Sequence, residues 1–214
     1  MLKIRKFEFN PLQENTYVLY DDTGECVIVD PGCYGKDEEE ELDAFITSAG
    51  LKVKMLLNTH CHIDHILGNW HIKTKYGVKL YIHAKDEIVL RAAKVYAPSY
   101  GIHQYHETEA DHFLSENEYV EFGNQKLKIL FVPGHSPGHV AFYDQETRQL
   151  VSGDVLFYNS IGRTDLPGGD FDTLIRSIHH MIFTLPDETV VFPGHGPETS
   201  VGFEKATNPF CGIE

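Results

Sequence analysis

The sequence predicts a mixed α/β (α+β) fold. Short apolar, β-rich segments recur along the chain, other segments carry apolar residues at helical spacing, and no linker or low-complexity tract divides them. With 214 residues, of which 42% are hydrophobic, the chain is long enough to bury an ample core. We therefore expect one domain over residues 1–214.

The first thirty residues predict three strands. Residues 1–10 alternate charged and apolar side chains, as a strand with one buried face does. Two β-rich stretches follow at 16–20 and 26–29, and the Asp-Asp-Thr-Gly segment between them has the composition of a turn. We expect these two stretches to form a hairpin.

A helix is expected next. The acidic run 37–41 leads into an apolar stripe at helical spacing, which Gly50 ends. Acidic residues suit the beginning of a helix because the helix dipole favours negative charge there. The stripe consists of Leu42, Phe45, Ile46 and Ala49.

The middle of the chain predicts two strands and a helix. The strands are expected at 55–57 and 78–82, with a helix between them that continues through residues 70–76. Residues 97–117 mix aromatic, histidine and acidic side chains without a clear period. We expect this segment to be a surface insertion, and loops of that length are often functional.

The second half of the chain is predicted to be rich in strands. A hairpin is expected from 119–122 and 126–132, followed by strands at 140–143 and 149–152. Apolar residues at helical spacing predict a helix over 171–182, before a last strand at 189–192.

Composition excludes several classes of protein. A formal net charge of −14 repels nucleic-acid phosphates and anionic lipids, so we expect neither nucleic acid nor membrane as a partner. The expected partner is a small-molecule substrate, on the grounds of the motifs described below. No apolar run approaches the roughly 20 residues of a membrane span. The N-terminus has no signal-peptide pattern, and the four cysteines show no C-x-x-C spacing. These observations favour a cytoplasmic protein; the oligomeric state stays open.

One pattern recurs at the ends of predicted strands. Four apolar strands run into a side chain that can bind a metal, namely His60, His135, Asp154 and His195. Two of these junctions share the tripeptide Pro-Gly-His. Strand ends gathered on one edge would bring these side chains into a single polar cluster.

The heptapeptide T-H-C-H-I-D-H at residues 59–65 adds further candidate ligands. His60 and His62 lie two apart, so in extended backbone they face the same way and can share one cation. Asp64 and His65 can then face a neighbouring cation. With the strand-end residues, the set holds five imidazoles and two carboxylates, donors that suit Zn²⁺, Fe²⁺ or Mn²⁺. We expect two divalent ions, zinc first among them, with Asp154 as the candidate bridge.

Together, T-H-C-H-I-D-H, the two P-G-H elements and G-D-V-L-F at 153–157 resemble the metallo-β-lactamase superfamily, in particular its short glyoxalase II-like hydrolase branch. The resemblance implies a four-layer αββα sandwich of two similar halves. It implies one ion held by His60, His62 and His135 and a second held by Asp64, His65 and His195. Asp154 would bridge the two ions.

The resemblance also implies a reaction. Metal-bound hydroxide, oriented by Asp64 as a catalytic residue, would attack the acyl carbon of a small thioester such as S-lactoylglutathione. Arg163, in G-R-T-D, matches a position that contacts the glutathione part of the substrate. Glyoxalase II proper has a C-terminal helical domain with further basic residues, whereas this sequence ends at Glu214. The alternatives are a lactonase with the same ligands and a mononuclear iron persulfide dioxygenase.

Overall fold

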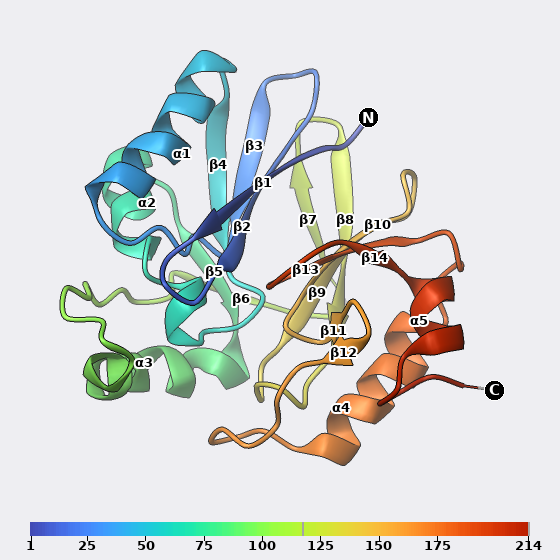
Figure 1. Ribbon diagram of the computed structural model, residues 1–214. Helices are drawn as coiled ribbons and strands as arrows, with labels where there is room; N and C mark the ends of the chain where they lie inside the picture. Colours follow the sequence, from blue (N-terminus) through green and yellow to red (C-terminus); the bar gives the residue numbers. More distant parts are fainter. Residues whose placement is uncertain (117, 214) are drawn as a thin grey trace.

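The computed structural model describes residues 1–116 and 118–213. It contains two six-stranded sheets (Figure 1). The first sheet has the order β1 (Lys3–Phe9), β2 (Glu14–Tyr20), β3 (Glu25–Val29), β4 (Lys52–Leu57), β5 (Leu80–His83), β6 (His112–Leu114). The second has the order β14 (Thr199–Ser200), β13 (Val190–Pro193), β10 (Gln149–Gly153), β9 (Val140–Asp144), β8 (Gln125–Phe131), β7 (Tyr119–Phe122). A small hairpin joins β11 (Leu156–Phe157) to β12 (Ser160–Ile161).

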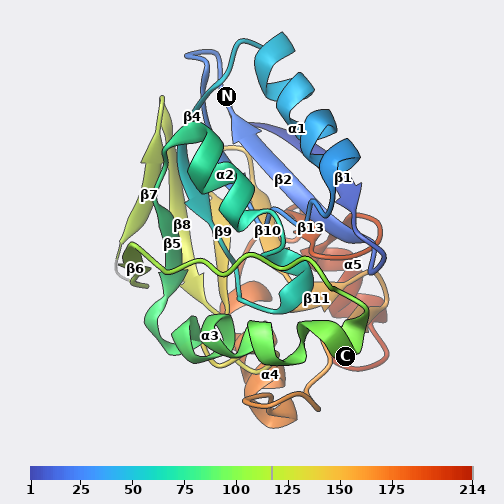
Figure 2. The same cartoon turned by 90° about the vertical axis from the view of Figure 1, so that its left-hand side faces the viewer.

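Helices cover the outer face of each sheet. The first sheet carries α1 (Lys36–Ser48), α2 (Asn69–Tyr76) and α3 (Glu87–Tyr96), and the second carries α4 (Phe171–Ser177) and α5 (Val201–Thr207). Figure 2 shows α1 and α2 along the strands of the first sheet and α3 crossing below them. The predicted four-layer αββα sandwich is therefore confirmed.

Successive side chains of a strand point to opposite faces of its sheet, and the buried residues form three apolar layers. In β2, Tyr17 and Leu19 face the space between the sheets, whereas Val18 faces the helices α1 to α3. In β3, Val27 and Ile28 divide in the same way. Both faces of these strands are covered, which explains the unbroken apolar runs at 17–20 and 26–29. A third cluster fills the space between the second sheet and α4 and α5.

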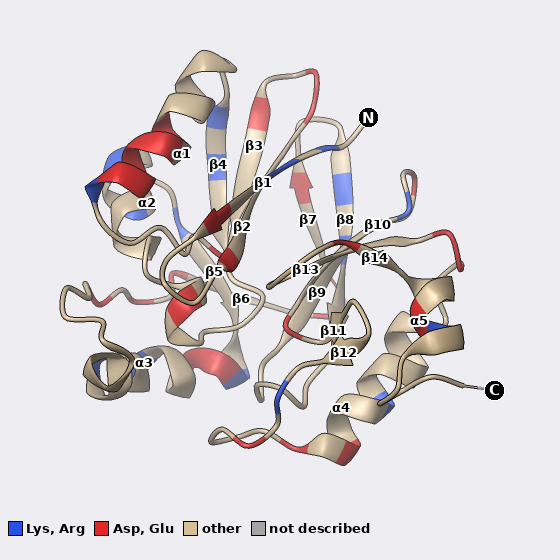
Figure 3. Ribbon diagram, in the orientation of Figure 1, with Lys and Arg blue, Asp and Glu red and all other residues tan. Residues whose placement is uncertain are grey.

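The acidic run forms the first turn of α1, as expected (Figure 3). The hairpins predicted at 16–29 and 119–132 are also present. The last predicted strand is not the last element, because β14 and α5 follow β13. The helix predicted over 171–182 is α4 followed by a π-helical turn, Ile178–Ile182.

The expectation of a surface insertion at 97–117 is only partly right. Within this range, β6 pairs with β5 and forms the edge of the first sheet, and Ile102 is buried in the cluster beneath the helices. The preceding helix α3 was not predicted from the sequence. A strand of three residues, two of them exposed, gives too short a pattern to be recognised. Asn117 lies outside the described residues.

No helix among residues 1–116 and 118–213 combines the length and the apolar character that crossing a bilayer requires.

Candidate metal centre

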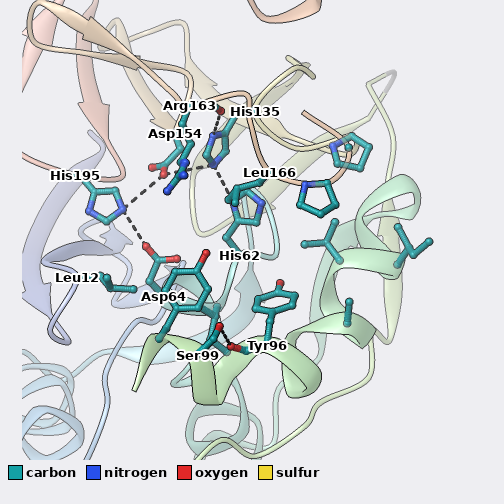
Figure 4. Close-up of a pocket in the computed structure, with 18 of the residues that line it drawn as sticks. Leu12, His62, Asp64, Tyr96, Ser99, His135, Asp154, Arg163, Leu166 and His195 are labelled. Carbon is teal, nitrogen blue, oxygen red and sulfur yellow. Dashed lines mark hydrogen bonds and ion pairs between the residues drawn. The ribbon is translucent and has the colours of Figure 1, made fainter. Parts of the chain in front are cut away.

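Sheet topology brings the predicted strand ends together. Strands β8 and β10 are both antiparallel to β9, and β10 is parallel to β13, so β8, β10 and β13 all run in one direction. Their carboxyl ends therefore share one edge of the second sheet, and the end of β4 in the first sheet faces it. All seven candidate metal ligands gather at this place, and five of them are labelled in Figure 4.

Three histidines form the first cluster. His62 Nδ1 lies 2.8 Å from His135 Nε2, which lies 3.2 Å from His60 Nε2. All three rings are buried. Burial, and then the neighbouring His65, lowers the pKa of His60 well below its ordinary value, and burial and His135 lower the pKa of His62 to about 3. Neutral imidazoles whose nitrogens converge are the donors that a divalent cation requires.

The second cluster contains Asp64, His65 and His195. Oδ2 of Asp64 lies 3.1 Å from Nε2 of His195 and 3.7 Å from Nε2 of His65. Burial alone would raise the pKa of Asp64, but His65 and the hydrogen bond with His195 lower it. Asp64 is therefore an ionised carboxylate in this setting.

Asp154 lies between the two clusters. Its Oδ1 is 3.5 Å from His65 Nε2, and its Oδ2 is 3.5 Å from His135 Nε2 and 3.6 Å from His195 Nε2. Burial alone would raise the pKa of Asp154, but His65 and the other histidines hold it well below the ordinary range. One buried carboxylate thus faces donors of both clusters.

The donor set fits two divalent ions. His65 Nε2 and Asp154 Oδ1 belong to the buried side-chain atoms of the described residues that have no hydrogen-bond partner. Burial alone would lower the pKa of His65, but Asp154 and Asp64 raise it well above its ordinary value, so this position favours positive charge. Gly194 keeps the space beside Asp154 open, because an added Cβ would lie 2.1 Å from Asp154 Oδ1, closer than van der Waals contact allows.

Buried carboxylates outside the predicted set hold the candidate ligands in place. Asp30 Oδ2 lies 3.1 Å from His65 Nδ1, and Asp30 also accepts a 2.7 Å hydrogen bond from the backbone N–H of Thr59. Asp86 accepts hydrogen bonds from the backbone N–H groups of Cys61 and Gly138. Sequence reasoning missed both residues. Asp30 follows the end of β3, which is the signal that could have found it.

His139 orients the backbone next to the site. Its Nε2 accepts a 3.0 Å hydrogen bond from the backbone N–H of Asp154. The ring stacks on His60, with centroids 4.7 Å apart. His139 therefore supports the ends of two strands.

Arg163 lies at the mouth of the site. Its guanidinium donates two 2.7 Å hydrogen bonds to the carboxylate of Asp165, and both side chains are largely exposed. The backbone carbonyl of Arg163 accepts a 2.8 Å hydrogen bond from His135 Nδ1, which directs His135 Nε2 toward the cluster. This backbone contact was not predicted.

A cleft of about 920 Å³ opens from the two clusters, a volume within the usual range for small-molecule sites. His62, Asp64, His135, Asp154 and His195 form one end. Most of the remaining wall comes from α3, from the hairpin β11–β12 and from the segment after β12 (Figure 4).

Comparison with known proteins identifies relatives along nearly the whole chain. "Probable metallo-hydrolase YqgX" of Bacillus subtilis (strain 168) is 38% identical over 211 residues, which are 98% of this chain and 97% of the relative. "Hydroxyacylglutathione hydrolase GloC" of Haemophilus influenzae is 36% identical over 200 residues, 92% of each protein.

Solved structures are similar to this protein over nearly the whole chain as well. The crystal structure of "BLEG-1 B3 metallo-beta-lactamase" matches with a TM-score of 0.89 and 38% identity, over 99% of both chains. "TTHA1623 in a di-iron-bound form" matches with a TM-score of 0.86 and 38% identity, over 96% of this chain and 99% of that one. The metallo-beta-lactamase superfamily model matches residues 9–195. From this match, and from relatives as similar as these, it follows that the chain belongs to the metallo-beta-lactamase superfamily.

Proposed function

We propose that the protein is a dinuclear metal-dependent hydrolase of a small thioester. His60, His62 and His135 would hold one divalent ion, and Asp64, His65 and His195 a second, with Asp154 as the bridge. The observation that carries this proposal is the position of Asp154 between two clusters of three donors. A site for a single ion would need only one of these two clusters.

Two divalent ions would supply Lewis acidity and a water of lowered pKa. Asp64, an ionised carboxylate at the edge of the cleft, accepts a hydrogen bond from the nucleophilic water and orients it. Asp30 and the Arg163 carbonyl fix the rings of His65 and His135. The Arg163 side chain, which lines the cleft, would contact the substrate there. A thiolate leaves readily, so the reaction requires no strong general acid.

Relatives support a thioester as the bond that is cleaved. One of them, at 36% identity, is named a hydroxyacylglutathione hydrolase, and S-lactoylglutathione is therefore the first substrate to test. The donor set accepts zinc, iron or manganese, and a neighbour of 38% identity has a di-iron centre. A B3 metallo-beta-lactamase of the same identity makes a β-lactam a necessary control substrate.

The decisive experiment pairs elemental analysis of the purified protein with a panel of a thioester, a lactone, a β-lactam and glutathione persulfide. We expect two metal ions per chain and thioester hydrolysis that continues without oxygen. One iron per chain with oxygen consumption on the persulfide would instead support the dioxygenase. Lactone or β-lactam turnover that exceeds thioester turnover would reject the thioesterase assignment.

A further inference from the structure

The cleft has an apolar wall beyond the candidate metal ligands. Along α3, Ile88, Ala92 and Tyr96 recur every fourth residue and line one side of the cleft. This stripe extends over about 12 Å at the helical rise. Pro137, Leu166 and Pro167 line the cleft as well. Figure 4 shows the Tyr96 ring rising from α3 toward His62 and Leu166.

Part of this wall is apolar surface left open to solvent. Ile88 is 72% exposed although it lines the cleft. Exposed apolar surface in a concave site gains free energy when a ligand removes it from water. The gain is large only if the ligand is itself apolar at that point.

The charges of the cleft do not match a glutathione conjugate. Among the lining residues, all within the described part of the chain, Arg163 is the single lysine or arginine. Its guanidinium is already paired with Asp165. The other polar groups away from the candidate ligands are the hydroxyls of Tyr96, Ser99, Tyr100 and Ser160. Glutathione carries two carboxylates. The one basic side chain in this wall, Arg163, already has its charge paired with Asp165.

We propose that the wall formed by α3 and the segment after β12 binds an aliphatic chain, so that the substrate is a thioester with a hydrocarbon group rather than a hydrophilic glutathione conjugate. The inference rests on the proposed function, because it names the substrate class of the same site. The chain belongs either to the acyl group or to the thiol, and both present the same surface to Ile88 and Leu166.

Two substrate series separate these sources in the metal-loaded protein. In the first, the acyl group of an N-acetylcysteamine thioester lengthens from acetyl to octanoyl; in the second, an acetyl thioester carries thiols from ethyl to octyl. Burial of each CH₂ is worth a factor of about four. We expect kcat/KM to rise by about that factor per CH₂ in at least one series and to exceed the value for S-lactoylglutathione. Two flat series, or S-lactoylglutathione as the better substrate, would overturn the inference.

A binding measurement keeps this test separate from the proposed function. S-octyl-N-acetylcysteamine is a thioether that cannot be hydrolysed, and its S-ethyl analogue is the short reference. We expect calorimetry to give at least tenfold tighter binding of the octyl compound. Chain-dependent binding without turnover of any thioester would reject the hydrolase and retain the apolar site. Equal affinities would reject the apolar site whatever the turnover.

Matched variants on α3 locate the effect. Ile88→Gln removes the apolar side chain from the cleft wall, and glutamine is a good helix former, so α3 should persist. Val95→Gln is the control, because Val95 is 84% exposed and does not line the cleft. We expect Ile88→Gln to lower the octyl-to-ethyl affinity ratio about fivefold and Val95→Gln to leave it unchanged. Equal effects of both substitutions would contradict a site in the cleft.

Discussion

The carboxylate of Asp30 lies 3.1 Å from Nδ1 of His65. The same carboxylate accepts hydrogen bonds from the N–H and Oγ1 of Thr59, the residue before His60. Asp30 therefore fixes one donor of the second cluster and the backbone that leads into the first.

Asp30→Asn tests this contact. We expect the affinity for the second metal ion to fall about 10- to 100-fold, because the amide orients His65 less firmly and makes it a weaker donor. Competition with a chelator measures the affinity. Asp172→Asn, an exposed acid on α4, is the control and should leave the affinity unchanged. Unaltered binding in Asp30→Asn would show that His65 does not depend on this carboxylate.

His60→Ala should lose metal and activity together. The His60 ring lies at the centre of the first cluster, with the rings of His62, His65 and His135 all within 4.8 Å, so its removal leaves that cluster incomplete. Metal content and thioester turnover are measured on the same preparation. His180→Ala, at an exposed position, should retain both. Turnover that survives in His60→Ala counts directly against the assignment.

Asp86→Ala should destabilise the protein. The Asp86 carboxylate accepts hydrogen bonds from Cys61 N at 2.6 Å and Gly138 N at 2.8 Å, joining the segments that carry His60 and His135. An unsatisfied buried N–H costs about 1–3 kcal/mol, so we expect a loss of about 3 kcal/mol. In a chain of this size, that lowers Tm by about 10 °C.

Thermal unfolding of Asp86→Ala and Asp86→Asn provides the comparison. The amide oxygen of asparagine keeps one acceptor, so the Tm of Asp86→Asn should lie between the Tm of Asp86→Ala and that of the parent protein. A Tm of Asp86→Ala equal to that of the parent would mean that the two segments are held by other contacts.

Asp21 should contribute stability that depends on pH. Burial alone would raise its pKa, but hydrogen bonds from Thr23, Gln125 and Asn124 hold it well below the ordinary value. A carboxyl whose pKa is lower in the folded state stabilises the protein above its unfolded pKa of about 3.9. That contribution is lost as the pH falls through the folded pKa.

Asp21→Asn isolates this contribution. Urea unfolding of both proteins in excess chelator removes any effect of metal release. The difference in unfolding free energy should be largest near pH 7 and should narrow from about pH 5 downward. A difference that is constant with pH would show that Asp21 acts through packing alone.

The strand ends and the candidate metal ligands could be predicted from the sequence because each is marked by a few consecutive residues. An apolar run followed by His135 or His195 can be read directly, and the sheets then bring these ends together. The roles of Asp30 and Asp86 depend on contacts between distant parts of the chain, which no local pattern carries. By contrast, α3 could have been predicted, because its buried residues Val89, Leu90 and Ala93 recur at helical spacing.

The two halves of Arg163 have separate tasks. Its carbonyl aligns His135, and any amino acid at this position supplies that carbonyl, whereas its side chain lines the cleft and pairs with Asp165. A different side chain at this position would therefore change the wall of the cleft, while the imidazole behind it keeps its alignment. The lining of the cleft and the alignment of its histidine can thus change independently of each other.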